Sequence, residues 1–141
     1  MASTLKINTL TGVSTAGSIA VTGEGNSTTT NLQQGLAKSW VNFNGTSTVA
    51  VRDSLNVSSI SDTDTGSYFQ NFTNNMNAVD YCGTGNAGKE AGGHTEDNSG
   101  YQNLAEISGL STSKRTVFIC KVNGSFVDRD HITGLVHGDL A

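Results

Sequence analysis

From Lys38 onward, apolar and polar residues alternate in short runs, and this alternation constrains the fold more than any other feature. Runs of period two are typical of strands that bury one face. Turn-forming residues separate the runs at intervals of about 8–12 residues, a spacing typical of β-sandwiches. We therefore predict an all-β chain in which residues 41–141 form a jelly-roll-like β-sandwich domain.

The runs also predict individual elements. Predicted strands cover residues 40–44, 48–52, 55–60, 67–72, 77–82, 104–107, 115–122, 125–127 and 132–137. Asn44-Gly45 is a strong turn signal, and residues 62–66 form the tip of a predicted hairpin. Residues 83–100 are rich in glycine and lack periodicity, so we predict that they form the longest loop.

The composition limits the size of the core. Gly, Ser, Thr and Asn together make up 65 of the 141 residues, whereas Leu, Ile, Val and Phe make up 31. The apolar share lies just above the ~20% at which disorder is expected, and the net charge of −4 is too small for a disordered polyelectrolyte. We therefore expect a folded chain with a small, shallow core.

Residues 1–31 differ in character from the rest of the chain. Nineteen of them are Gly, Ser, Thr or Asn, and their apolar residues form only short alternations. Strands of that length cannot bury both faces alone, so we expect an extended arm that docks on a neighbouring chain. An unstructured tail is the alternative.

The strongest helix signal covers residues 28–38. Thr or Asn residues can cap this segment, and Leu32 and Leu36 lie four residues apart on one helical face. Trp40 continues that spacing, although the period-two pattern favours a strand there. Gly35 costs a helix about 1 kcal/mol, and so short a helix is not stable alone in water. We predict a short helical neck over residues 32–40 that packs against a symmetric partner.

Two motifs resemble ligand loops but are incomplete. Residues 83–90 nearly match a phosphate-binding P-loop, but Glu90 stands where Ser or Thr would ligate magnesium. Asp62 and Asp64 have the spacing of a calcium loop, but the glycine and the glutamate that the complete loop needs are missing. We predict neither a nucleotide nor a calcium site.

No catalytic constellation stands out, so we expect no enzyme activity and no cofactor. The sequence holds no Gly-x-Ser-x-Gly elbow and no marked pair of carboxylates. His131 and His137 would share one face of a strand, and threefold symmetry could gather one histidine per chain around a metal. A metal site on a threefold axis is therefore the alternative to ordinary surface histidines. We expect Cys82 and Cys120 to be buried thiols without a disulfide.

Charge and hydropathy exclude several partners. The net charge of −4 and the scattered basic residues argue against nucleic-acid binding, which needs a basic face. No run of 18 apolar residues is present, so we expect no membrane insertion. The first twelve residues lack the basic and apolar regions of a secretory signal, so we expect no export.

The chain resembles small tail-fibre-like structural proteins of phages that infect marine and cyanobacterial hosts. The matching segments are residues 3–10 (STLKINTL), residues 28–76 and the strand that enters residues 79–81. The most specific part is LQQGLAK at residues 32–38, followed by WVNFNG at residues 40–45. The resemblance covers about the first 80 residues.

The resemblance implies a virion protein that is made in the host cytoplasm. Residues 1–31 would attach to another virion protein, a helical neck would follow, and the β-domain would face outward in a homotrimer. Leu32, Leu36 and Trp40 are then expected to form the trimer neck core. The outward domain could bind a glycan on the host surface, and Tyr101, close to Gln102 and Asn103, is the candidate contact.

Other functions stay open beside the trimeric tail fibre. A head fibre or capsid decoration protein would share the architecture but would differ in copy number per particle. A virion-bound enzyme acting on polysaccharide would need two carboxylates about 5–9.5 Å apart. A free-standing lectin would have no use for the arm.

Overall fold

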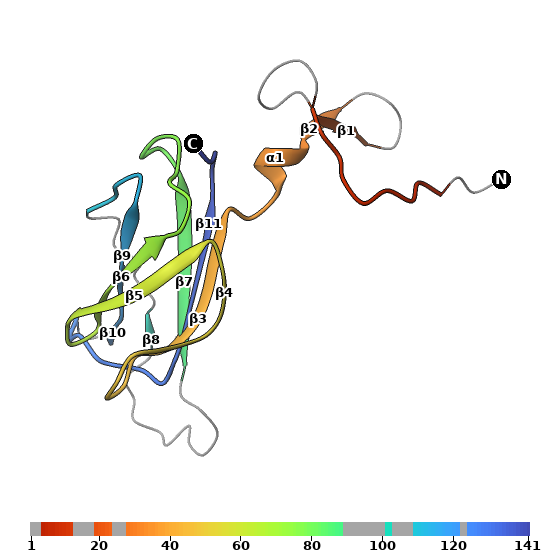
Figure 1. The fold of residues 1–141 in the computed structure, drawn as a ribbon. Helices are drawn as coiled ribbons and strands as arrows, with labels where there is room; N and C mark the ends of the chain where they lie inside the picture. Colours follow the sequence, from red (N-terminus) through yellow and green to blue (C-terminus); the bar gives the residue numbers. More distant parts are fainter. Residues whose placement is uncertain (1–3, 13–18, 24–27, 89–100, 103–108, 122–123) are drawn as a thin grey trace. The chain divides into compact units, whose positions relative to one another are not determined.

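The computed structural model describes residues 4–12, 19–23, 28–88, 101–102, 109–121 and 124–141. The chain divides into two compact units, Met1–Leu36 and Ala37–Ala141, and each is described by itself. The described residues are mostly in strands, as the alternation predicted, and they include a single short helix (Figure 1).

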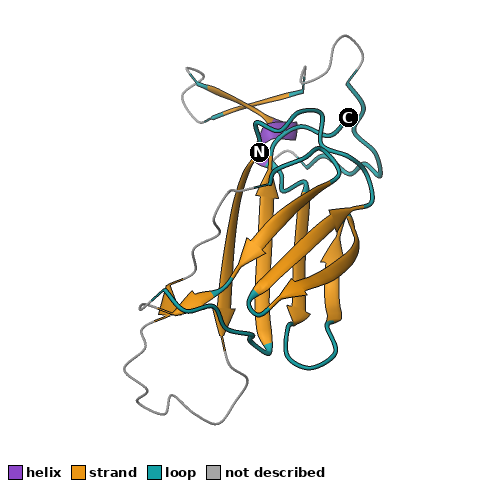
Figure 2. Ribbon diagram, turned by 90° about the vertical axis from the view of Figure 1, so that its left-hand side faces the viewer, coloured by secondary structure: helices purple, strands orange, loops and turns teal. Residues whose placement is uncertain are grey.

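The larger unit consists mainly of two antiparallel sheets that pack face to face (Figure 2). In spatial order, the four-stranded sheet contains β4 (Ala50–Leu55), β3 (Ser39–Asn44), β11 (His131–His137) and β7 (Cys82–Gly88). The three-stranded sheet contains β5 (Val57–Asp64), β6 (Ser67–Phe72) and β9 (Lys114–Phe118). The predicted hairpin is confirmed, because β5 pairs with β6, but its tip is shorter than the predicted residues 62–66: β5 continues to Asp64, and only Thr65 and Gly66 form the turn.

The chain passes from one sheet to the other at Asn56, the one residue between β4 and β5. Asn56 has a φ of 54°, a left-handed conformation that asparagine adopts more readily than most residues. Two hydrogen bonds of its side chain stabilise this connection: Oδ1 accepts from the Asn74 backbone N–H at 2.7 Å, and Nδ2 donates to the Asn74 carbonyl at 3.1 Å.

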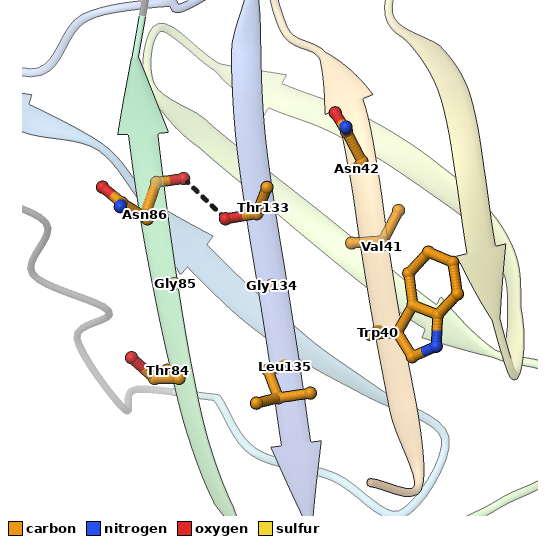
Figure 3. Close-up of a pocket in the computed structure, with 9 residues that line it drawn as sticks. All are labelled: Trp40, Val41, Asn42, Thr84, Gly85, Asn86, Thr133, Gly134 and Leu135. Atoms are coloured by element: carbon orange, nitrogen blue, oxygen red, sulfur yellow. Dashed lines mark hydrogen bonds between the residues drawn. The ribbon is translucent and has the colours of Figure 1, made fainter.

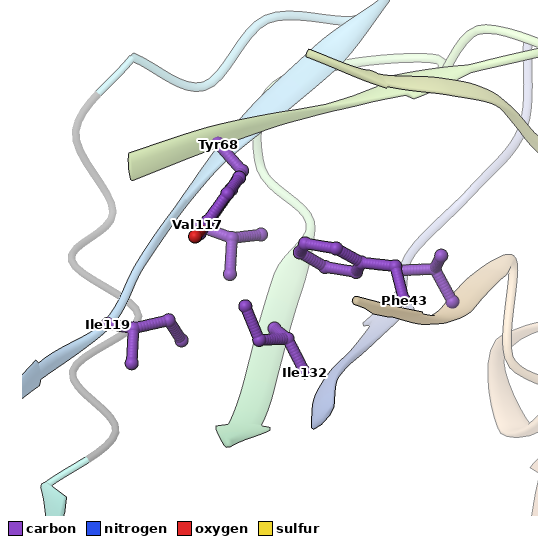
Figure 4. Packing of buried hydrophobic residues seen from close by; sticks show 6 residues of the cluster. Phe43, Tyr68, Val117, Ile119 and Ile132 are labelled. Carbon is purple, nitrogen blue, oxygen red and sulfur yellow. The ribbon is translucent and has the colours of Figure 1, made fainter. Parts of the chain in front are cut away.

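Strict alternation of buried and partly buried residues along β3, β6 and β11 builds the core in three levels. The first level is apolar, and Figure 4 shows its side chains converging from both sheets. It contains Val41, Phe43, Tyr68, Val117, Ile119 and Ile132. Phe43 and Tyr68 meet edge to face, with ring centroids 5.2 Å apart, a geometry that aromatic pairs prefer.

The hydroxyl of Tyr68 lies among polar groups at the border of this level. It lies 2.9 Å from the Gly45 carbonyl and 2.7 Å from Asp128 Oδ1, and both oxygens can accept its proton. Asp128 Oδ1 also accepts from the Gly66 N–H at 2.7 Å. Burial raises the pKa of Tyr68, and the bond to Asp128 raises it further, since both disfavour the phenolate.

The middle level is polar. Arg115 is 3% exposed; its Nε donates to Gln70 Oε1 at 2.9 Å, and its Nη2 donates to the Thr84 carbonyl at 3.1 Å. Gln70 in turn donates to Ser39 Oγ at 2.8 Å. Burial lowers the pKa of Arg115 to about 10. Gly134 leaves the space that the guanidinium occupies, because a Cβ there would collide with it.

The third level is apolar again and contains Phe72, Met76, Tyr81 and Val136. The Phe72 and Tyr81 rings meet edge to face, with centroids 5.8 Å apart. The Tyr81 hydroxyl lies 3.1 Å from both the Ser111 and Lys114 carbonyls, so its polar end has acceptors. The two apolar levels thus enclose the Arg115 level.

Three predicted elements in this unit are wrong. The strand predicted over residues 125–127 is absent, since Phe126 forms only an isolated bridge with Cys120. Residues 77–82 were predicted as a strand, but only Cys82 belongs to one, and Tyr81 instead packs into the third level. Residues 83–88, predicted as part of the long loop, belong to strand β7. This glycine-rich strand has little apolar periodicity of its own, and its pairing with β11 over seven residues defines it. The predicted strand at 104–107 and most of the remaining loop lie outside the described residues.

The smaller unit contains β1 (Ala20–Thr22), β2 (Thr29–Asn31) and α1 (Leu32–Gly35). Asn31 caps α1, because its Oδ1 accepts from the Gln34 N–H at 3.1 Å. None of the described residues before Ala37 is buried. The helix is shorter than the predicted neck over residues 32–40, because Leu36 is already extended and β3 begins at Ser39.

In the described part of the chain, no helix is long and apolar enough to cross a membrane.

Candidate functional site

The outward face of the four-stranded sheet carries the most distinctive set of surface side chains. Alternation along each strand, together with the register between strands, decides which residues point outward. We call this surface the outer face. Its residues are Leu55 and Asp53 on β4, Trp40, Asn42 and Asn44 on β3, His131, Thr133, Leu135 and His137 on β11, and Cys82, Thr84 and Asn86 on β7.

One row of the outer face is apolar. Trp40 lies directly opposite Leu135 on one side and Leu55 on the other, so the three side chains form a continuous stripe across β11, β3 and β4. Leu55 is 47% exposed, and Trp40 is only partly buried. Directly opposed residues in an antiparallel sheet have Cβ atoms about 4.5–5.5 Å apart, close enough for these side chains to touch. We call this stripe the apolar row.

The neighbouring row is polar. It contains Asp53, Asn42, Thr133 and Asn86, one residue from each strand, and we call it the polar row. Thr133 Oγ1 donates to the Asn86 carbonyl at 3.4 Å. Asn42 Nδ2 lies 3.4 Å from His131 Nε2. The Oδ1 atom of Asn42 is buried, and no hydrogen-bond partner for it is found among the described residues.

A shallow depression of about 640 Å³ lies where the two rows meet, across β3, β11 and β7. Figure 3 shows its lining residues, among them the indole of Trp40, the side chain of Leu135 and the polar groups of Thr133 and Asn86. The complete lining is Trp40, Val41, Asn42, Thr84, Gly85, Asn86, Thr133, Gly134 and Leu135. No residue of this lining carries an acidic or basic side chain.

Arg115 lies on the other side of the sheet from this depression. Its guanidinium occupies the space beside Gly83 and Gly134, between the two sheets, and donates to Gln70 and to the Thr84 backbone. The guanidinium therefore supports the strands beneath the depression and does not belong to its lining.

The three residues of the predicted trimer neck do not continue one helix. Leu32 begins α1 and Leu36 follows its last residue, whereas Trp40 lies in β3 of the other unit. Alternation in β3 orients Trp40 onto the outer face. The expected contact of these residues in a trimer stays a prediction.

Tyr101, the predicted glycan contact, belongs to β8 (Tyr101–Gln102), which pairs with β10 (Cys120–Lys121). Its backbone lies opposite Lys121, in a pair of strands separate from the four-stranded sheet. The binding role of Tyr101 stays a prediction.

The histidine and cysteine predictions have mixed outcomes. His131 and His137 share the outer face of β11, as predicted. Within the described ranges, no three His, Cys, Asp or Glu side chains gather as a metal site. No disulfide joins the two cysteines, but only Cys120 is buried. Cys82 is exposed, because β7 orients it outward opposite His137.

Sequence reasoning did not anticipate the polar row. Asn86 lay in the predicted loop, and Asn42 and Thr133 were ordinary polar positions of alternating strands. The alternation could have shown that Asn42 and Thr133 point outward from their strands. Only the pairing of β11 with both β3 and β7 places these residues side by side.

Comparison of the chain with protein-family models, with curated proteins and with solved structures gave no match.

Proposed function

We propose that this protein is a phage virion structural protein, a subunit of a short trimeric tail fibre. In this proposal residues 1–31 attach to another virion protein, and the β-domain, with jelly-roll-like connections, faces the host surface. The fibre assembles in the host cytoplasm and acts by attachment rather than by catalysis.

The observation that supports the proposal most is the unburied apolar surface of the smaller unit. Five of its large apolar side chains are between 51% and 80% exposed, namely Leu5, Ile7, Leu10, Val21 and Leu36. Complete burial of such a side chain contributes about 1.5–3 kcal/mol. A segment that leaves five of them in water gains more from an assembly partner than from its own contacts.

The larger unit supports the other half of the proposal. It has its own three-level core, so it can keep its structure while the smaller unit is engaged elsewhere. A domain of this kind can display a binding face, and the outer face is our candidate for that role.

Light scattering on the full chain tests the oligomeric part. A mass near three times 14.6 kDa, about 44 kDa, is expected for the wild type.

A set of variants tests attachment to the virion. The double variant Leu5→Asp with Ile7→Asp should weaken attachment, whereas Thr9→Asp, which adds one charge to the same segment, serves as a control. Co-sedimentation of each variant with purified phage particles measures attachment, and equal co-sedimentation of all variants would contradict it.

The number of copies per particle separates the tail fibre from a head fibre or capsid decoration protein. Quantitative mass spectrometry of purified particles gives this number. A few trimers per particle fit the tail fibre, whereas copies in proportion to the capsid subunits fit decoration of the head.

A further inference from the structure

We propose that the depression on the outer face binds an uncharged saccharide, with one pyranose ring stacked on Trp40. This inference rests on the proposed function, since it gives the displayed domain its ligand class and binding residues. It places the site on β3, β11 and β7 rather than at Tyr101. It also assigns Trp40, which lies in β3 and not in α1, to the ligand site instead of the predicted trimer neck.

The apolar row supplies the stacking surface. Small-molecule sites combine apolar, often aromatic surface with a few polar groups that fix the orientation of the ligand. Pyranose rings carry C–H groups on one face, and these can pack against an indole. Trp40 lies between Leu55 and Leu135, so a ring stacked on its indole would pack on an apolar stripe that is now partly exposed to water.

The polar row supplies hydrogen-bonding groups of the required kind. Sugar hydroxyls both donate and accept, so they need partners that together offer both functions. Asn42, Asn86, Thr84 and Thr133 line the depression and provide amide and hydroxyl groups along β3, β11 and β7. The chemistry of this lining matches a polyhydroxylated ligand better than a purely apolar or an ionic one.

The charge of the lining favours a neutral ligand. A carboxylate or sulfate on a sugar is usually held by arginine or lysine, and neither occurs in the lining. Arg115 is buried between the sheets and already donates to Gln70 and Thr84, so it is not available to an anionic ligand. Asp53, at the end of the polar row, would further disfavour a negative charge.

The chain offers a direct probe, because Trp40 is its one tryptophan. Titration of the full chain with lactose, cellobiose or N,N′-diacetylchitobiose, followed by tryptophan emission, should give a saturable change for at least one of these sugars. Addition of 3′-sialyllactose tests the charge preference against lactose. We expect the sialylated sugar to bind more weakly than its neutral counterpart.

Variants then assign the response to the depression. With binding measured by calorimetry, Trp40→Ala should weaken the affinity at least tenfold, and Thr133→Val, which removes one hydroxyl at nearly constant shape, should weaken it severalfold. Phe69→Ala truncates an aromatic side chain on β6 of the other sheet and should leave the affinity unchanged. Circular dichroism confirms that each variant is folded.

Four outcomes would overturn the inference, the first three of which concern sugar binding. Those three are no saturable response to any of the three neutral sugars, tighter binding of 3′-sialyllactose than of lactose, or wild-type affinity in Trp40→Ala. A fall in solution mass caused by Trp40→Ala would also overturn it, because a second copy of the chain would then cover the face. Light scattering and co-sedimentation test the fibre separately, so loss of sugar binding alone leaves the proposed function standing.

Discussion

The two units of this chain use similar residue types to opposite effect. In the larger unit, apolar residues at every second position converge between two sheets and form two apolar levels around a polar one. In the smaller unit, apolar residues such as Leu5 and Ile7 also alternate with polar ones, yet no described residue is buried there. Alternation therefore produces a core only where a second layer of the same chain covers it.

The largest expected contrast between the units comes from truncating an apolar side chain in each. Phe43→Ala should lower the free energy of unfolding of the larger unit by about 3–5 kcal/mol, because Phe43 is fully buried in the first core level. Leu10→Ala, at a side chain that is 53% exposed, should change it by less than about 0.5 kcal/mol. Urea denaturation, monitored by Trp40 emission, measures the free energy of unfolding of both variants. Equal losses of free energy in Phe43→Ala and Leu10→Ala would contradict the contrast between the units.

The second contrast concerns a buried amide. Gln70→Leu should cost about 1–3 kcal/mol, because it leaves Arg115 Nε without its acceptor and Ser39 without its donor. Gln33→Leu, an equal change in shape at an exposed position of α1, should be close to neutral. The same denaturation series measures both variants. A neutral Gln70→Leu would mean that the polar level contributes little to stability.

The third prediction uses pH to isolate the contribution of Tyr68 to the free energy of unfolding. Its pKa is raised in the folded state, so above pH 10 the unfolded chain releases this proton while the folded chain keeps it, and the stabilising contribution of Tyr68 falls. Arg115 acts in the opposite direction, because its folded-state pKa is lowered to about 10. The difference between wild type and Tyr68→Phe removes the arginine contribution.

Above pH 10 the wild type should therefore lose up to about 1.4 kcal/mol per pH unit relative to Tyr68→Phe. Urea denaturation of both proteins between pH 8 and pH 11 gives this difference. A constant difference over that range would mean that Tyr68 ionises equally easily in both states.

The last variant, Leu36→Asp, should leave the fold of the larger unit unchanged but should change the oligomeric state of the chain. Leu36→Asp places a charge on an apolar side chain that is 54% exposed, so it should dissociate the proposed trimer and shift the solution mass from about 44 kDa towards 14.6 kDa. Trp40 emission and the near-ultraviolet circular dichroism should stay unchanged, because Trp40 belongs to the larger unit. An unchanged mass would contradict a role of Leu36 in the neck.

Much of the fold could be predicted because the relevant signals are local. Alternation identified β3, β6 and β11 to within a residue. The polar residues 62–66 indicated the hairpin of β5 and β6, although the turn itself is confined to Thr65 and Gly66. The helix began where the cap and leucine spacing indicated, but it ended at Gly35, because the strand signal around Trp40 prevailed.

The elements that escaped prediction depend on distant partners. β7 carries glycines at Gly83, Gly85 and Gly88, so its own side chains give no strand signal. Its pairing with β11 makes it a strand, and the space beside Gly83 receives Arg115 from the opposite sheet. Arg115 itself had the sequence appearance of an ordinary strand residue, and only the packing of the two sheets buries it.

The sequence by itself determined that the chain is rich in strands, that its first 31 residues lack the means to form a core, and that its apolar residues are few. These properties follow from composition and from periodicity along the chain. The tertiary structure alone decided that Trp40, Thr133 and Asn86 share one surface, because strands far apart in sequence meet there in a fixed register. Side-chain periodicity assigns a residue to a face of its strand, whereas the pairing of strands decides its neighbours on that face.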